Sequence, residues 1–174
     1  MATAPPALLR TIRLLDGISL WSGRAVACLV VPMVLGLVYE VVARYLFNAP
    51  TVWAYDLTFM LYGTFFMLGS AYALQRKAHI RTDTFYGNWS PRVQGAVDAA
   101  CYAVLFPALL VFFWAGWSFF ARSFGQGERI VTSPWMPIIY PFKLVMPLAT
   151  LLLLLQSVSE FLKSLWAARS GEWL

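Results

Sequence analysis

Four long apolar stretches, separated by short charged segments, organise the chain. They cover approximately residues 25–43, 57–75, 99–121 and 144–162. Three of them are bounded by charged residues twenty positions apart, namely Arg24 and Arg44, Asp56 and Arg76, and Lys143 and Lys163. At about 1.5 Å per residue, a helix of that length covers roughly 30 Å, the thickness of the hydrocarbon core of a bilayer. The pattern predicts an all-α integral membrane protein with four transmembrane helices in a single domain, residues 1–174.

The first apolar stretch is predicted to be a retained transmembrane helix. A cleaved signal peptide would have a shorter apolar region and an A-x-A site, whereas Glu40 and Arg44 come here instead. Proline removes a backbone donor in three of the four stretches, so we expect a bend in each; these prolines are Pro32, Pro107 and Pro147.

Lysine and arginine are unequally distributed between the two sides of the predicted bundle. Nine fall on the side of the termini and four on the other side, which are Arg44, Arg122, Arg129 and Lys143. Because cytoplasmic segments carry the excess of these residues, we expect both termini in the cytoplasm.

A separate pattern precedes the first stretch. Leu8, Leu9, Ile12 and Leu15 share one face of a helix, and the arginines take another. This arrangement predicts a short amphipathic helix over about residues 8–20 that lies on the inner leaflet. The alternative is a frayed tail that leads into the first transmembrane helix.

Composition supports a membrane environment. Of the residues, 60% are apolar and 12% charged, whereas soluble domains carry roughly 25% charged residues. A soluble fold with so few polar side chains could not cover its surface. The net charge of +5 does not indicate nucleic-acid binding, because the basic residues lie in clusters between apolar stretches. Membrane lipids are therefore expected partners, and nucleic acid is not.

The sequence lacks the residue patterns of enzymes and of cofactor sites. A haem-binding bundle needs axial ligands such as paired histidines, and the chain has one histidine, His79. There is no G-x-S-x-G, no HExxH and no CxxC pair. We therefore expect no catalytic residues, no cofactor and no bound metal.

Charged residues within or beside the apolar stretches are the first candidates for function, because burying charge in a membrane is costly. Glu40 precedes Arg44 by four residues, a spacing that favours an ion pair on the helix surface. Gly36 lies on the same side, so another helix could approach there. The pair either ends the first transmembrane helix or contacts a second subunit.

The second stretch carries a polar stripe. Asp56 begins the stretch, where a carboxylate can cap the free N–H groups of a helix. Asp56, Gly63 and Ser70 recur every seven residues, a pattern suited to tight helix packing. Lys143 opens the fourth stretch, and the simplest expectation is that its ammonium group extends to the outer headgroups.

Two sequence segments match the pattern of a known family. Residues 44–57 read RYLFNAPTVWAYDL, and residues 69–83 read GSAYALQRKAHIRTD. They resemble the DctQ-like small membrane subunit of tripartite ATP-independent periplasmic (TRAP) transporters. That family has a tryptophan and an acid where the second helix begins, and a glycine, a basic pair, a histidine and an acid where it ends. The matching residues are Trp53, Asp56, Gly69, Arg76, Lys77, His79 and Asp83. Many members carry a second acid where this chain has Tyr55.

The resemblance implies a role in a transport complex of the bacterial inner membrane. A periplasmic binding protein would deliver an organic acid to a large membrane subunit, which couples uptake to a sodium gradient. The small subunit would support that large subunit and help to dock the binding protein. The docking candidates lie in the outer loop before the fourth stretch and are Glu128, Arg129 and Trp135.

Two hypotheses from other functional classes stay open on the sequence alone. The chain could form a homo-oligomeric channel or carrier, in which Glu40, Arg44 and Asp56 line a shared path. A cytochrome-like electron carrier is the other.

Overall fold

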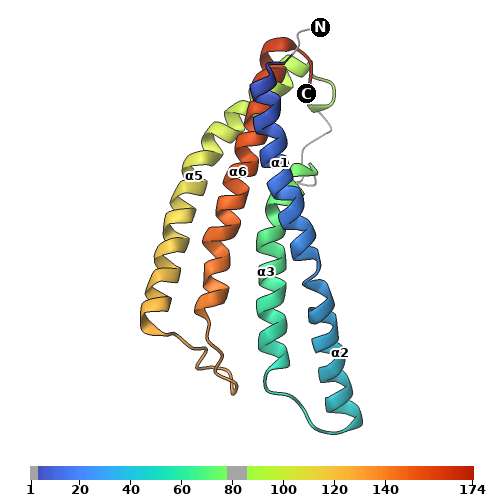
Figure 1. Cartoon of the computed structure of the whole chain (residues 1–174), viewed down its shortest axis with the longest axis vertical. Coiled ribbons are helices and arrows are strands. Elements are labelled where there is room, and N and C mark those ends of the chain that lie inside the picture. The colour runs from blue at the N-terminus through green and yellow to red at the C-terminus, as the bar shows by residue number, and fades with distance from the viewer. Residues whose placement is uncertain (1–3, 78–85) are drawn as a thin grey trace.

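Five helices make up the described part of the chain, residues 4–77 and 86–174 of a computed structural model (Figure 1). No strand is present in these ranges. The helices are α1 (Pro6–Ala27), α2 (Val30–Leu46), α3 (Ala54–Gln75), α5 (Pro91–Gln126) and α6 (Tyr140–Ser170). The all-α prediction is confirmed.

A proline explains the break between α1 and α2. The ring of a proline inside a helix clashes with the carbonyl group four residues earlier and removes one hydrogen bond. Four residues before Pro32 stands Cys28, and the backbone there tightens: the amides of Cys28 and Leu29 bond to the carbonyl oxygens of Ala25 and Val26. The bend predicted at Pro32 therefore lies one turn before the proline.

Four helical segments of the described chain are long and apolar enough to cross a membrane, which confirms the predicted number. They are Pro6–Leu46, Ala54–Gln75, Pro91–Gln126 and Tyr140–Ser170. The predicted span in α3 nearly equals the helix, but the other three segments extend well beyond the spans predicted in them. A helix of 36 residues such as α5 is roughly 54 Å long, well beyond the roughly 30 Å hydrocarbon core.

Helix α6 is the centre of the fold. It contacts α1, α3 and α5, whereas α2 packs on α3. Within the most apolar stretch of each helix, 44% of the α6 residues are buried, against 11% or fewer in the others. Figure 1 shows the start of α1 and the end of α6 together at one end of the bundle, which we call the terminal end. The loops of residues 47–53 and 127–139 lie at the opposite end, the loop end.

The contact between α5 and α6 follows a repeat of seven residues. The buried positions of α5 are Gly95, Ala99, Tyr102, Leu109, Gly116 and Ser123, and those of α6 include Lys143, Thr150, Ser157 and Ser164. A period near 3.5 keeps one face of a helix turned toward its neighbour, and small residues allow close approach. A Cβ atom at Gly95 would come within 2.5 Å of the carbonyl oxygen of Ser164.

The predicted amphipathic helix is present, but it packs on the rest of the chain. It forms the first part of α1, in which Ile12 is buried and Leu8 is half-buried beside Leu165 and Trp166 of α6. Arg10 and Arg13 are exposed, as their face predicted. The apolar face therefore contacts α6, where the sequence predicted contact with lipid.

We expect Gly95→Ala to destabilise the chain by about 1–3 kcal/mol, because the added methyl group meets the α6 backbone, which cannot move aside. Thermal denaturation in detergent measures the effect. Gly125→Ala is the matched control, since a Cβ atom at Gly125 has no neighbour within 4 Å. Equal stability of the two variants would contradict close backbone packing at Gly95.

Candidate functional site

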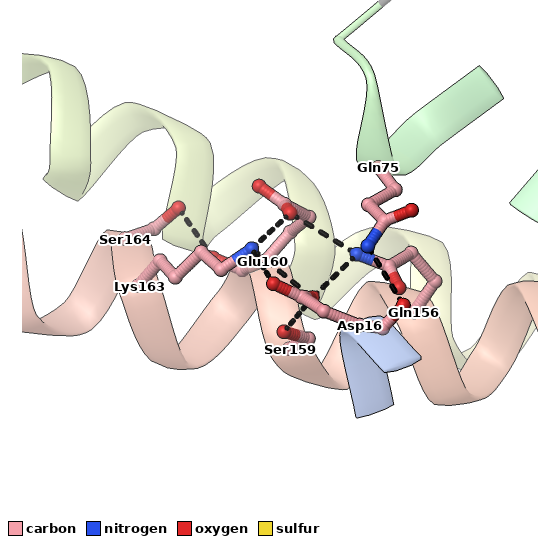
Figure 2. A network of polar contacts seen from close by, with 7 residues as sticks. All are labelled: Asp16, Gln75, Gln156, Ser159, Glu160, Lys163 and Ser164. Carbon is pink, nitrogen blue, oxygen red and sulfur yellow. Dashed lines mark hydrogen bonds and ion pairs between the residues drawn. The ribbon is translucent and has the colours of Figure 1, made fainter. Parts of the chain in front are cut away.

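A network of charged and amide side chains joins three helices near the terminal end (Figure 2). The ammonium group of Lys163 contacts Asp16 Oδ2 at 2.8 Å and Glu160 Oε1 at 2.7 Å. Asp16 Oδ1 also accepts hydrogen bonds from Ser159 Oγ at 2.7 Å and from Gln156 Nε2 at 3.0 Å. We call this group, together with Gln75, the Asp16 network.

Gln75 extends the Asp16 network to α3. Its side-chain amide donates to the backbone oxygen of Asp16 at 2.7 Å. Asp16 on α1 thus contacts α6 through its carboxylate, which binds Lys163, and α3 through its backbone oxygen, which binds Gln75. These are the two helices that pack beside α1. The network therefore sets how α1, α3 and α6 are positioned relative to one another.

Most of the Asp16 network is removed from solvent. Gln156 and Ser159 are fully buried, and Glu160 is 3% exposed. A buried carboxylate is tolerated only when it is paired and hydrogen-bonded, and here one lysine lies between two carboxylates. Removing the lysine would leave two negative charges facing each other.

The sequence interpretation did not identify the Asp16 network. The sequence pattern marks Lys163 as a boundary of the fourth span and as one of the nine basic residues on the side of the termini, and it singles out neither Asp16 nor Glu160. One signal was available: Gln156, Ser159, Glu160 and Lys163 recur at intervals of three and four along one helix, which places them on one face.

At the loop end, Glu40 forms the ion pair predicted with Arg44. The Arg44 Nε group donates to Glu40 Oε1 at 2.8 Å. The other carboxylate oxygen accepts hydrogen bonds from the amide of Thr51, at 2.9 Å, and from its hydroxyl group. Glu40 thus ties α2 to the loop that leads into α3, and the nearby stacking of Tyr39 on Trp53, at 5.7 Å between ring centroids, joins the same two segments.

Asp56 joins α3 to the loop of residues 127–139. It lies in the first turn of α3, but the expected capping is not formed, because this helix start has no side-chain cap hydrogen bond. The Asp56 carboxylate accepts a hydrogen bond from the Ser133 hydroxyl group instead. Ser133 in turn accepts from the amide of Trp135 at 3.1 Å. The residue therefore makes a contact between distant segments in addition to its favourable place at a helix start.

Lys143 corrects a prediction. Its side chain is 8% exposed and does not extend toward headgroups. The ammonium group pairs with Glu128 and lies 3.9 Å from the centre of the Phe119 ring, an arrangement that favours a cation through the ring quadrupole. The hydrogen bond from Lys143 lowers the pKa of Glu128 below its ordinary value of 4.5.

The loop of residues 127–139 is held by backbone hydrogen bonds. The amides of Ile130 and Ile139 bond to the carbonyl oxygens of Pro137 and Glu128, both at 3.1 Å, and Arg129 donates to the oxygen of Met136 at 3.2 Å. Of the three docking candidates, Arg129 is exposed and Trp135 is 42% exposed. Glu128 is bound to Lys143, so its carboxylate already has an internal partner.

The predicted stripe on α3 packs mainly within the chain. A Cβ atom at Gly63 would come within 2.7 Å of the Phe142 ring of α6, and Ser70 donates to the backbone oxygen of Met67 at 2.7 Å. At Gly36 a Cβ atom would make an ordinary contact of 3.8 Å with Thr58, so α2 and α3 are close there. Gly69 faces an open groove, with no neighbour within 4 Å.

Of the remaining predicted residues, the structure describes Arg76, which follows the end of α3. Arg76 donates to the Tyr72 hydroxyl group at 3.1 Å. His79 and Asp83 lie outside the described residues. Within the described ranges, no group of three His, Cys, Asp or Glu residues is placed to hold a metal ion. The polar clusters at both ends thus join helices and loops.

Residues 33–166 match the protein family described as "Tripartite ATP-independent periplasmic transporters, DctQ component". The chain belongs to this family. The DctQ component is the small membrane subunit of a TRAP transporter, a part of a transport system and not an enzyme. A comparison with curated proteins found no match.

In this DctQ chain we expect Lys163→Met to lower stability by about 3–5 kcal/mol, because it leaves the buried carboxylate of Glu160 and the partly buried carboxylate of Asp16 without a cation. Asp16→Asn should cost less, about 1–3 kcal/mol, since Lys163 and Glu160 remain a neutral pair. Thermal unfolding in detergent measures both, with exposed Arg13→Met and Glu172→Gln as controls. If Asp16→Asn proved the more damaging of the two, the central place of Lys163 would be wrong.

The pair of Glu128 and Lys143 has a defined pH dependence. Because the pKa of Glu128 is lowered in the folded chain, the pair stabilises the loop fully above pH 4.5, the ordinary glutamate value, and its contribution is lost as the pH falls through the lower folded value. The difference in melting temperature between the unmodified chain and Glu128→Gln should therefore be constant at neutral pH and shrink in acid. A difference that grows in acid would contradict this pairing.

Proposed function

We propose that this DctQ subunit is a scaffold that supports the large membrane subunit in sodium-coupled, binding-protein-dependent uptake of an organic acid. One observation carries the proposal. Within each end of the bundle, the described charged side chains pair with one another, and apolar side chains cover the helices between the two ends. An ion or substrate pathway needs polar groups along its length. The proposed pathway therefore belongs to the large subunit.

The positions of the charges also bear on the homo-oligomeric channel as an alternative. Glu40 and Arg44 pair with each other, and Asp56 binds Ser133. All three lie near the loop end, where they hold loops in place. To line a shared path, these three side chains would have to break the contacts that they make here.

We place the contact with the large subunit on α2. This helix packs on α3, and its buried residue is Ala43. Leu35 is 63% exposed and Val38 is 53% exposed. Glu40 and the ring stack of Tyr39 with Trp53 hold α2 in position, so it presents a rigid apolar face on which a second membrane protein can pack.

Docking of the binding protein is proposed at Arg129 and Trp135. Both are accessible, and aromatic and arginine side chains are enriched at protein interfaces. The backbone bonds of the loop present them in a fixed position. This loop faces the periplasm if both termini lie in the cytoplasm of a bacterial inner membrane, as the lysine and arginine distribution supports.

The decisive test is a mild affinity purification of the tagged chain from its native membrane, followed by mass spectrometry. We expect a multi-span large subunit in stoichiometric amount, and solute uptake only when large subunit, small subunit and binding protein are reconstituted together. Recovery of this chain alone, with solute flux through vesicles that contain only this chain, would refute the scaffold role.

The α2 interface has its own test in the same purification. We expect Leu35→Trp with Val38→Trp to reduce recovery of the large subunit, because two added indoles separate the packed faces. Leu110→Trp with Val111→Trp on exposed positions of α5 is the matched control. Loss of the large subunit only with the α5 variant would move the interface to α5.

A further inference from the structure

An apolar groove lies between α1 and α3. Its volume is about 460 Å³, within the roughly 300–1,000 Å³ of clefts that bind small ligands. Gly23 and Val26 line it from α1, and Phe65, Gly69 and Tyr72 from α3. We call it the Gly69 groove.

Two glycines have opposite roles in the Gly69 groove. A Cβ atom at Gly23 would come within 2.5 Å of the Tyr72 side chain, so this glycine lets α1 and α3 approach. A Cβ atom at Gly69 would meet nothing within 4 Å. The lack of a side chain at Gly69 therefore keeps the groove open, and it is not needed for close packing between helices of this chain.

Two arginines adjoin residues that line the groove. Arg76 donates to the Tyr72 hydroxyl group at 3.1 Å and lies 5.3 Å from the centre of its ring, so it contacts a residue that lines the groove. Arg24 comes directly after Gly23, and its guanidinium group turns back over Trp21, at 5.7 Å from the ring. Both arginines are exposed.

The arginines and the apolar lining are offset along the groove. Arg76 follows the end of α3, and the guanidinium of Arg24 turns toward the start of α1, so both charges lie toward the terminal end. Phe65 lies two helical turns before Tyr72 on α3, toward the loop end. Trp21 is 69% exposed, as is typical of an indole at the level of the lipid headgroups.

We propose that the Gly69 groove binds an anionic phospholipid, with one acyl chain in the groove and the phosphate group held by Arg24 and Arg76. Guanidinium groups present paired N–H donors that match phosphate oxygens. A bare partner helix would fill the apolar groove equally well, but it would bring no anion to the two guanidinium groups. The lipid accounts for both features, and its binding is independent of which solute the transporter carries.

The groove is tested by native mass spectrometry of the tagged chain, purified with its bound partners and mixed with phosphatidylglycerol or phosphatidylcholine. Gly69→Leu places a side chain in the groove, where its Cβ atom has no neighbour within 4 Å, and should lower lipid binding about tenfold, because several CH₂ groups lose their site. Gly125→Leu, on an equally open glycine of α5, is the control and should bind as the unmodified chain does.

The headgroup contact is tested separately. Arg24→Gln with Arg76→Gln should remove about tenfold of the preference for phosphatidylglycerol over phosphatidylcholine. Arg13→Gln with Arg122→Gln, at other exposed arginines, should leave that preference unchanged. Equal binding of both lipids to the unmodified chain would overturn the proposal. Unchanged lipid binding in Gly69→Leu would also overturn the proposal, whether or not the large subunit is lost. If the large subunit is lost in that variant while lipid binding is unchanged, the groove binds a partner helix.

Discussion

The arrangement of three helices depends on the ion pairs that the ammonium group of Lys163 makes with two carboxylates. In a membrane, lipid tails are as apolar as leucine, so burial of apolar area does not drive helices together; close packing and polar contacts do. Lys163 meets carboxylates from α1 and from its own helix, and the amide of Gln75 adds α3 to the same cluster. Without it, α1 would retain its contacts with α3 but would lose the charged anchor to the central helix.

The two ends of the bundle are stabilised differently, although each uses few charges. At the terminal end, the ions lie between helices among buried amide and hydroxyl groups. At the loop end, Glu40, Asp56 and Lys143 each connect a helix to a loop. Between the ends, small residues at seven-residue intervals allow α5 to lie close to α6. Such a chain keeps a fixed shape while its outer surface remains apolar, which suits the scaffold role proposed above.

The membrane fold was predictable because hydrocarbon thickness fixes the length of an apolar stretch between charges, and the ion pair of Glu40 with Arg44 followed from helical spacing. The contacts between distant segments were not predictable in this way. Nothing local to Asp16 indicates that Lys163, far along the chain, is its partner. Lys143 was expected at the headgroups because a lysine at a helix start usually extends outward, but the loop of residues 127–139 covers it and supplies Glu128. The stripe of Asp56, Gly63 and Ser70 was recognised as a packing surface, whereas its neighbour on α6 required the structure.

The central position of α6 has a consequence for biogenesis. Because α6 follows α1, α2, α3 and α5 in the sequence, those helices leave the ribosome before the helix that packs against α1, α3 and α5 is made. During that interval Asp16 lacks Lys163, and Gly95 lacks the α6 backbone against which it packs. The contacts of α6 with α1, α3 and α5 therefore form only after residues 140–170 have been synthesised. A chain cut before Lys163 would lack the cation that pairs with both Asp16 and Glu160.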